Sequence, residues 1–582
     1  MDMKLSSYKQ HLGSLFLAVL SGIGVILLLL AYHRIFLLEM QGPVTSDFTQ
    51  YAVVARGILN GLTPYTDLFE ARPPGMPLLI ALSMKLTNSA SLVTVFSLVA
   101  SVTTVLLFAF FACKSTANES RLRSRLVIIG FALALGISLQ LFVQERAGAL
   151  ETESFGAWFG LLYVTTFFYS DKKWITIWRA LLLCICIGIK EPFLFSLLGV
   201  ALLLSNDVRD FIKSFVVPLA IAVVIGSLLL LLLGMFGVYI GDYLPVILNT
   251  RMSTELRSPL FLRILDIRKL YGNAVTYTSI PALGVLLTIC WVSFLYIKNI
   301  TLSDRYIWKY VLAAASLTGF IYWSHRLFSY VYPLVFLKHE VIGVPWVKMI
   351  LLWAIFTSLM IFLIRKLVVS SKESSRILLI ATFAILMVSL AVGSGGRYNH
   401  YHYVFAAPAY AALLFQLIQS VARREVGQPR LIFVLACATF LLGITYQTPS
   451  NHIDELKRLQ AYNPRSNKLV IMQFEELMQN CGYSRYVSIG TVDKLAFAKY
   501  SPIGPMAEMN RHDYIDPEHE IYQETYRNIL SEGQIVIVDP NEEPHPVLPQ
   551  LLQQNFTANA PACAKGLLPL ANYKTYFRLS DL

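Results

Sequence analysis

Residues 214–236 read SFVVPLAIAVVIGSLLLLLLGMF, an apolar stretch without a single charged side chain. A helix needs about 20 such residues to cross the hydrocarbon core of a bilayer. Apolar runs of similar length recur from residue 14 to residue 446, and the mean hydropathy of the chain is +0.58. A soluble domain could not cover that much apolar surface, so the sequence predicts an α-helical membrane protein with many crossings.

The basic residues are spread in short clusters between the apolar runs, although the formal net charge is +12. Nucleic-acid-binding proteins gather such residues into one patch, whereas clusters beside apolar runs follow the rule that positive loops remain in the cytoplasm. We therefore expect no nucleic-acid partner and place these clusters, with the amino terminus, in the cytoplasm. The clusters are Lys114, Arg121, Arg123 and Arg125; Lys172, Lys173 and Arg179; Arg209 and Lys213; Lys298, Arg305 and Lys309; Arg365, Lys366, Lys372 and Arg376; and Arg423, Arg424 and Arg430.

This pattern predicts about thirteen crossings, with the amino terminus in the cytoplasm and the carboxy terminus outside. The fifth and sixth spans are short for a membrane helix, which leaves the number of crossings open by two. The predicted spans are 14–37, 90–113, 126–143, 155–170, 176–189, 193–204, 214–236, 281–297, 310–323, 346–364, 377–393, 404–420 and 431–446. The first run is too long for a signal-peptide core and has no small-residue cleavage site, so we expect it to be retained. Residues 74–86 are too few to cross and predict an interfacial or re-entrant helix.

The composition changes after residue 446. Residues 1–446 form the expected transmembrane domain, whereas residues 447–582 are mostly polar and predict a small α/β domain on the outer side. Its predicted strands are 486–489 and 534–538, and its predicted helices are 469–478 and 521–530. Its two cysteines, Cys481 and Cys563, could pair in an oxidising compartment. No spacing of Cys and His in the sequence indicates a structural zinc site.

The first outer loop, residues 38–89, contains a predicted helix. Ser46 or Asp47 can cap its amino-terminal end, and apolar residues between 51 and 59 share one helical face. The pair Asn60-Gly61 is typical of the end of a helix.

Ionisable residues gather in several loops on the predicted outer side, where charge close to a membrane is costly and indicates function. A carboxylate there can remove the proton from an acceptor hydroxyl that attacks an anomeric carbon. Cations can stabilise a phosphate as it leaves. The candidates are Asp47, Asp67, Glu70 and Arg72; Glu145, Glu151 and Glu153; Lys190; Arg326; and Arg397, His400 and His402. Their types and positions suit sugar transfer from a lipid-phosphate donor but are not specific to that reaction.

Several motifs sharpen this interpretation: Asp47, Tyr51-Ala52, Gly61-Leu62-Thr63-Pro64-Tyr65, Arg72-Pro73-Pro74, Thr152-Glu153-Ser154-Phe155, Lys190-Glu191-Pro192, and His402-Tyr403 before Pro408. Together they resemble the GT-C glycosyltransferases, in particular the bacterial branch related to protein O-mannosyltransferases and the lipid A aminoarabinose transferase. The resemblance covers most of residues 10–446, and the first loop carries its most specific part. Two positions depart from the pattern, because Phe48 follows Asp47 where many relatives have Glu, and Arg72 replaces the usual Lys of the aminoarabinose branch.

The resemblance implies a role for each candidate. Asp47 would be the catalytic base, and Glu153 a second catalytic acid that orients the base or the acceptor, with Glu145 and Glu151 as rivals. Residues expected to bind substrate or phosphate are Arg72, Lys190, Asp67, Glu70, Tyr65, Arg326, Arg397, His400 and His402. Structural roles stay open for several of them, such as a helix cap for Asp47 or pairing with Arg72 for Asp67 and Glu70.

The resemblance further implies an inverting transfer of a sugar, with a hexose expected, from a polyprenyl-phosphate donor. The acceptor hydroxyl would belong to a cell-envelope glycolipid (such as lipopolysaccharide), a polysaccharide or a protein at the outer, periplasmic face of a bacterial inner membrane. No cofactor is expected, although a divalent metal stays open because the oligosaccharyltransferase branch uses one. The alternatives are a transporter or flippase, and a ligase or polymerase for lipid-linked glycans.

Overall fold

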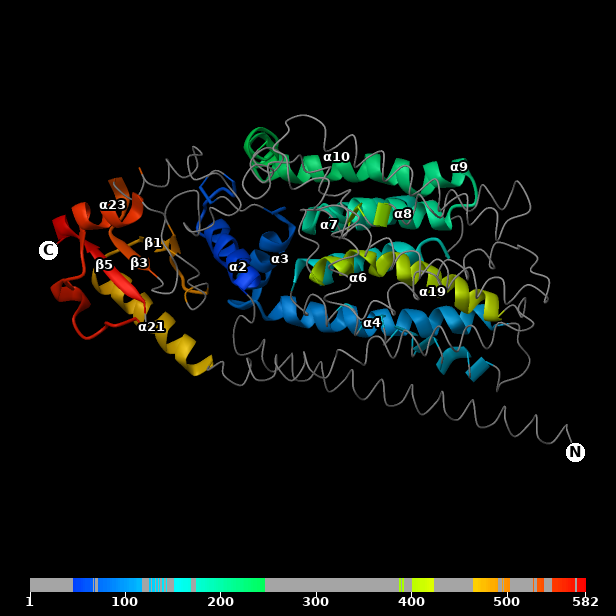
Figure 1. The fold of residues 1–582 in the computed structure, drawn as a ribbon, viewed down its shortest axis with the longest axis horizontal. Helices are drawn as coiled ribbons and strands as arrows, with labels where there is room; N and C mark the ends of the chain where they lie inside the picture. The colour runs from blue at the N-terminus through cyan, green and yellow to red at the C-terminus, as the bar shows by residue number, and fades with distance from the viewer. Residues whose placement is uncertain are drawn as a thin grey trace, which may run out of the picture.

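The structure of the protein, a computed structural model, describes residues 46–65, 67–68, 72–117, 151–168, 174–245, 400–422, 464–489, 497–502, 531–538, 547–570 and 573–581, parts of 125–143 and 387–391, and residues 495 and 527. Within these residues the chain is mostly helical (Figure 1). Two described stretches, Ser91–Ser115 and Val208–Leu232, are long and apolar enough to cross a membrane. The predicted spans 14–37, 281–297, 310–323, 346–364 and 431–446 lie outside the described residues.

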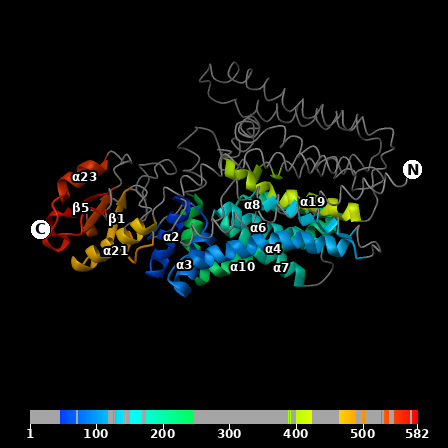
Figure 2. The same cartoon turned by 90° about the horizontal axis from the view of Figure 1, so that it is seen from below.

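A bundle of apolar helices forms the larger part of the described chain, and its members run side by side along the long axis (Figures 1 and 2). They are α4 (Ser91–Ser115), α6 (Thr152–Thr165), α7 (Trp174–Ile189), α8 (Phe193–Leu204), α10 (Val217–Leu232) and α19 (Ala407–Ala422). Short segments α9 (Val208–Phe211) and η1 (Ile212–Val216) lead into α10, and η4 (His400–Ala406) leads into α19. The helices begin and end within a few residues of the predicted spans, except that the stretch before α10 starts six residues earlier, at Val208.

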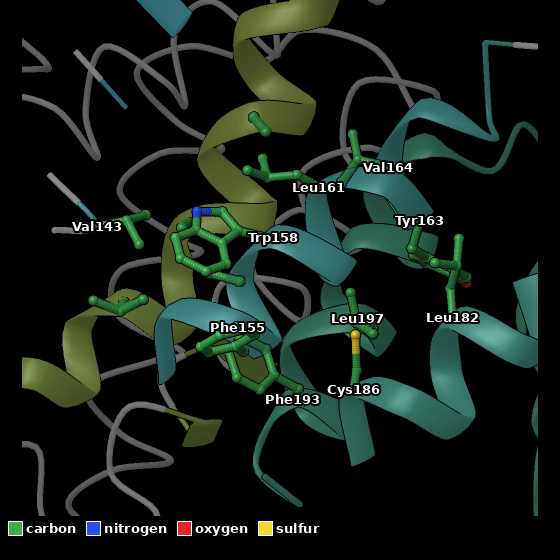
Figure 3. Packing of buried hydrophobic residues seen from close by; sticks show 14 of the residues in the cluster. Val143, Phe155, Trp158, Leu161, Tyr163, Val164, Leu182, Cys186, Phe193 and Leu197 are labelled. Carbon is green, nitrogen blue, oxygen red and sulfur yellow. The ribbon is translucent and has the colours of Figure 1, made fainter. Parts of the chain in front are cut away.

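The core of the bundle depends on close approach of α6 to its neighbours. Figure 3 shows Phe155 of α6 beside Phe193 of α8, and the Trp158 ring lies 5.0 Å from that of Phe155. A Cβ atom on Gly156 would lie 2.1 Å from the Phe193 ring, and one on Gly160 would lie 2.6 Å from Pro408. Glycine at these two positions therefore lets α8 and α19 pack directly against the α6 backbone.

Buried polar groups inside the bundle are joined to one another. The Trp158 indole donates to Gln140 Oε1 at 3.2 Å, and Gln140 Nε2 donates to the Ser101 hydroxyl at 3.0 Å. Where no water competes, polar side chains must find partners between helices, so this chain of bonds ties α4 to α6 through the segment that carries Gln140.

The first outer loop contains two helices, α2 (Ser46–Leu59) and α3 (Gly75–Thr87). The first one ends where the sequence predicts, because Asn60 forms a turn and Gly61 has a φ of +84°. The second confirms a helix over the apolar segment 74–86. A Cβ atom on Gly75 would lie 2.4 Å from the Gly188 carbonyl oxygen, so glycine allows α3 to start directly against the end of α7.

The carboxy-terminal part forms a five-stranded sheet in the order β2-β1-β3-β5-β4. Its elements are α21 (Pro464–Asn480), β1 (Arg485–Ile489), β2 (Ser501–Pro502), β3 (Ile535–Val538), α23 (Val547–Asn555), β4 (Phe556–Thr557), η6 (Ala562–Ala564), β5 (Lys574–Arg578) and η7 (Leu579–Asp581). Parallel pairs join β1 to β2 and β3, whereas β5 pairs antiparallel with β3 and β4. Both predicted strands and the helix at 469–478 are confirmed. Residue Arg527 is helical, but the rest of 521–530 lies outside the described residues.

Cys481 and Cys563 form a disulfide that joins the end of α21 to η6. The cluster beside it is apolar and includes Phe474, Tyr486 and Phe577, each at most 2% exposed. The small sheet therefore has its own hydrophobic core and a covalent link between its helix and its last loop, as the two cysteines suggested.

Candidate functional site

An ion pair between Glu153 and Lys190 is buried at one end of the helical bundle. Lys190 Nζ lies 2.9 Å from Glu153 Oε1, and the Thr152 hydroxyl donates to Glu153 Oε2 at 2.8 Å. Glu153 stands in the first turn of α6, where the helix dipole favours negative charge. Only 2% of Glu153 is exposed. Such a pair needs a reason beyond stability, because desolvating both ions costs several kcal/mol each.

The turn Lys190-Glu191-Pro192 positions the lysine, as the sequence predicts. Lys190 N–H donates to the Cys186 carbonyl at 2.9 Å and so terminates α7, and Pro192 directly precedes α8. Because α7 ends and α8 begins within a few residues, Lys190 lies where the two helices meet, and its side chain reaches the first turn of α6. The two motifs Thr152-Glu153 and Lys190-Glu191-Pro192 thus meet in one place.

His402 of η4 joins this pair. It is 8% exposed and lies close enough to Glu153 for an electrostatic interaction with the carboxylate. The His402 ring also lies 5.6 Å from the Phe405 ring, and the Phe405 carbonyl accepts a hydrogen bond from Ser196 of α8. These contacts hold the segment around His402 against the site, although His402 follows Glu153 by roughly 250 residues in the sequence.

Arg72 is the buried cation of the first loop. It is 6% exposed, its Nη1 donates to Gln50 Oε1 at 3.3 Å, and its guanidinium lies 5.1 Å from the centre of the Tyr51 ring. Gln50 and Tyr51 follow Asp47 by three and four residues in α2, which is one helical turn. The structure therefore brings the Arg-Pro-Pro motif to the helix that carries Asp47.

Tyrosines connect the first loop to the Lys190 turn. The Tyr65 hydroxyl donates to the Arg72 carbonyl at 2.9 Å, and the Tyr65 ring lies 4.6 Å from that of Tyr243. The Tyr243 hydroxyl in turn donates to Glu191 Oε1 at 2.7 Å. Burial, and then the Glu191 carboxylate, raise the pKa of Tyr243 well above its ordinary value, so the phenol keeps the proton that it donates.

Sequence reasoning missed Gln50, Tyr239 and Tyr243, and it named Glu191 only as the middle residue of the Lys190-Glu191-Pro192 motif. The two late tyrosines lie in η2 (Tyr239–Tyr243), a π-helical segment just after α10. Their spacing of four residues was the available signal, but nothing in the local sequence indicates that they meet Tyr65 and Glu191.

The remaining candidates have different outcomes. Asp67 Oδ2 accepts from the Thr63 N–H at 2.7 Å, so this carboxylate stabilises its own turn. Glu151 directly precedes α6. Asp47 lies in the first turn of α2, and His400 is the first residue of η4. Outside the described residues lie Glu70, Glu145, Arg326 and Arg397. In the described part of the chain, no three or more His, Cys, Asp or Glu residues gather as a metal site.

The carboxy-terminal sheet docks on α2 beside the site (Figure 1). Asn60 Nδ2 donates to the Lys499 carbonyl at 3.0 Å and to the Ser501 hydroxyl at 2.7 Å. The rings of Phe48 and Phe497 lie 6.4 Å apart. Burial lowers the pKa of Arg56, and the nearby Glu475 carboxylate opposes this shift. The domain therefore contacts the Asp47 helix near both of its ends.

The opposite end of the bundle carries cations. Lys114 Nζ donates to the Phe168 carbonyl at 3.3 Å, and Arg179 donates to the hydroxyl and the carbonyl of Thr166 at 2.8 and 3.1 Å. Both contacts lie at the carboxy-terminal end of α6, and Glu153 lies at its amino-terminal end. A helix of 14 residues is about 21 Å long, which separates the two polar ends.

Comparisons with known proteins return no relative: no family model, no curated protein and no solved structure matches this chain.

Proposed function

We propose that the protein is an inverting glycosyltransferase with a GT-C architecture of about thirteen spans, which transfers a sugar from a polyprenyl-phosphate donor to an acceptor hydroxyl. The observation that carries this proposal is the buried Glu153–Lys190 pair beside His402, at the end of the bundle where α3 packs against the end of α7 and carries α2. A structural protein gains little from such a pair, because an apolar pair of the same volume is at least as stabilising.

The proposed reaction is a single displacement. Asp47 accepts the proton of the acceptor hydroxyl as its oxygen forms a bond to the anomeric carbon. The bond between that carbon and the phosphate oxygen breaks at the same time, and polyprenyl phosphate leaves with the electron pair. Lys190 and Arg72 stabilise the charge that develops on the phosphate. Glu153 holds the Lys190 side chain in place through their ion pair, and His402 lies close to the same carboxylate.

The arrangement of charges supports a site on the outer face of the membrane; the membrane we propose is a bacterial inner membrane, with the site facing the periplasm. Lys114 and Arg179 lie at the end of α6 remote from Glu153, as the positive-inside rule requires if Glu153 faces outward. The disulfide lies in the domain that docks near the Glu153 end, and such bonds persist in oxidising compartments. The same domain is well placed to contact a glycolipid, polysaccharide or protein acceptor.

Sugar transfer by purified protein in detergent tests the proposal. Wild type and Asp47→Asn are given radiolabelled undecaprenyl-phosphate sugars (glucose, galactose, mannose and aminoarabinose forms) with a membrane-glycolipid extract. We expect transfer by wild type from one donor and a loss of at least ~10²-fold in Asp47→Asn.

The matched control is Asp207→Asn, which changes the N-cap carboxylate of α9, whose Oδ1 accepts from the Asp210 N–H; Asp207 follows the end of α8 that is remote from the Lys190 turn. This control should transfer at the wild-type rate. Full activity of Asp47→Asn would remove the proposed base. Absence of transfer from every donor would overturn the enzyme proposal and favour transport of lipid-linked sugars.

A further inference from the structure

Three tyrosine rings form a cluster beside the Lys190 turn. The ring centres of Tyr239 and Tyr243 lie 4.8 Å apart and nearly parallel, and Tyr65 lies 5.7 and 4.6 Å from them. Tyr65 and Tyr243 are buried, whereas Tyr239 is half-buried. The cluster thus has two inner rings and one outer ring that keeps part of its surface open to a ligand.

Two backbone irregularities build this cluster. Tyr65 has a φ of +69°, which is uncommon for a residue with a bulky side chain and costs on the order of 1 kcal/mol or more. Tyr239 and Tyr243 lie in a π-helical turn, a rare conformation that is frequent at functional sites. Hydrophobic packing does not require tyrosines at positions with such unusual backbone conformations. A ligand that three tyrosine rings could bind would explain them.

The hydroxyls of the two inner rings have structural partners. Tyr65 donates to the Arg72 carbonyl and Tyr243 to Glu191. These bonds hold the two inner rings in place, and the Tyr239 ring stacks on that of Tyr243. A fixed aromatic face is what a sugar needs, because the C–H groups of a pyranose carry partial positive charge and the face of an aromatic ring is negative.

We propose that Tyr239, supported by Tyr243 and Tyr65, is the platform on which the pyranose ring of the donor packs; this subsite rests on the proposed glycosyltransferase function. The donor is favoured over the acceptor by position. Tyr243 is bonded to Glu191, the neighbour of Lys190 in a tight turn. In the donor, the sugar is attached directly to the phosphate that Lys190 would bind, so an aromatic ring beside this turn meets the donor's sugar.

Binding tests the platform separately from catalysis. The probes are the undecaprenyl-phosphate sugar that wild type binds most tightly in the panel above and undecaprenyl phosphate without sugar, measured with wild type, Tyr239→Leu and Tyr239→Phe. We expect Tyr239→Leu to weaken binding of the sugar-bearing lipid about tenfold and to leave binding of the sugar-free lipid unchanged. Tyr239→Phe keeps the ring and should bind both lipids like wild type. The control is Trp178→Leu, which removes an exposed aromatic ring from α7 (43% exposed) and should change neither affinity.

Equal weakening of both lipids in Tyr239→Leu would overturn the platform, as would an unchanged affinity for the sugar-bearing lipid. Hydrogen exchange of residues 236–243 in wild type provides a second measurement that needs no variant. The sugar-bearing lipid should slow exchange there more than undecaprenyl phosphate does, and equal protection would contradict the proposal. If wild type binds the sugar in this way but transfers none, the proposed enzyme fails while the platform stands.

Discussion

The two ends of α6 are both polar, but they use their charges differently. At the carboxy-terminal end, Arg179 and Lys114 donate to backbone carbonyls that a helix end leaves without partners, and cations there also suit the helix dipole. At the amino-terminal end, Glu153 pairs with the side chain of another ion, Lys190, in a buried setting. The first arrangement is explained by helix stability. The second costs desolvation energy, which is why we assign the function to that end.

The largest expected effect comes from separating the ions at the Glu153 end. Glu153→Gln leaves Lys190 without its counter-charge, and a broken buried pair costs about 3–5 kcal/mol in the free energy of unfolding. The double variant Glu153→Gln/Lys190→Met removes both charges and should recover most of that stability. We expect neither variant to transfer sugar.

Thermal unfolding in detergent and the transfer assay check this prediction together. Recovery of transfer along with stability in the double variant would mean that the pair is structural. In that case the difference between the two ends of α6 would carry no functional meaning.

The next largest effect concerns the close contact of α3 with α7. A Cβ atom on Gly75 would lie 2.4 Å from the Gly188 carbonyl oxygen, whereas a Cβ atom on Gly188 meets nothing within 4 Å. We expect Gly75→Ala to destabilise the protein by about 1–3 kcal/mol through overpacking. Gly188→Ala is the matched control and should be neutral or slightly stabilising, because alanine favours a helix. Equal unfolding temperatures for the two variants would contradict the contact.

A smaller effect is expected at the other end of α6. Arg179→Met removes two hydrogen bonds to Thr166 and a cation–π contact 4.4 Å from the centre of the Phe167 ring. The loss should be about 1–2 kcal/mol of unfolding free energy. Transfer per folded molecule should stay at the wild-type rate, in contrast to the Glu153 variants. A large loss of transfer in folded Arg179→Met would make the two ends functionally equivalent.

The smallest effect is expected where the carboxy-terminal sheet meets α2. Asn60→Ala removes two hydrogen bonds that the Asn60 side chain makes with Lys499 and Ser501, worth about 1 kcal/mol each at most. Faster hydrogen exchange in residues 495–502, with an unchanged exchange rate in α6, would be the expected signature. Exchange that is unchanged in both segments would show that the domain is held by other contacts, such as the one between Phe48 and Phe497.

Local signals predicted most of the helices in the described part of the chain but few of their contacts. The bounds of α8 and the end of α2 at Asn60-Gly61 follow from apolar length and from glycine after the last turn. The short strands β2 and β4 were not predicted, because two residues carry no periodicity. The role of Asp67 was also open, since a carboxylate near Arg72 in sequence can equally bond the backbone of its own turn.

The sequence by itself predicted helices long and apolar enough to cross a membrane, a short helix that contains Asp47 and ends at Asn60-Gly61, and a tight turn at Lys190 between two apolar helices. These properties follow from the hydrophobicity of consecutive residues and from local backbone preferences. Only the tertiary structure decided which charges meet. Glu153 pairs with Lys190, and Glu191 with Tyr243, because helices packed side by side bring distant loops to one end, and no local pattern encodes that register.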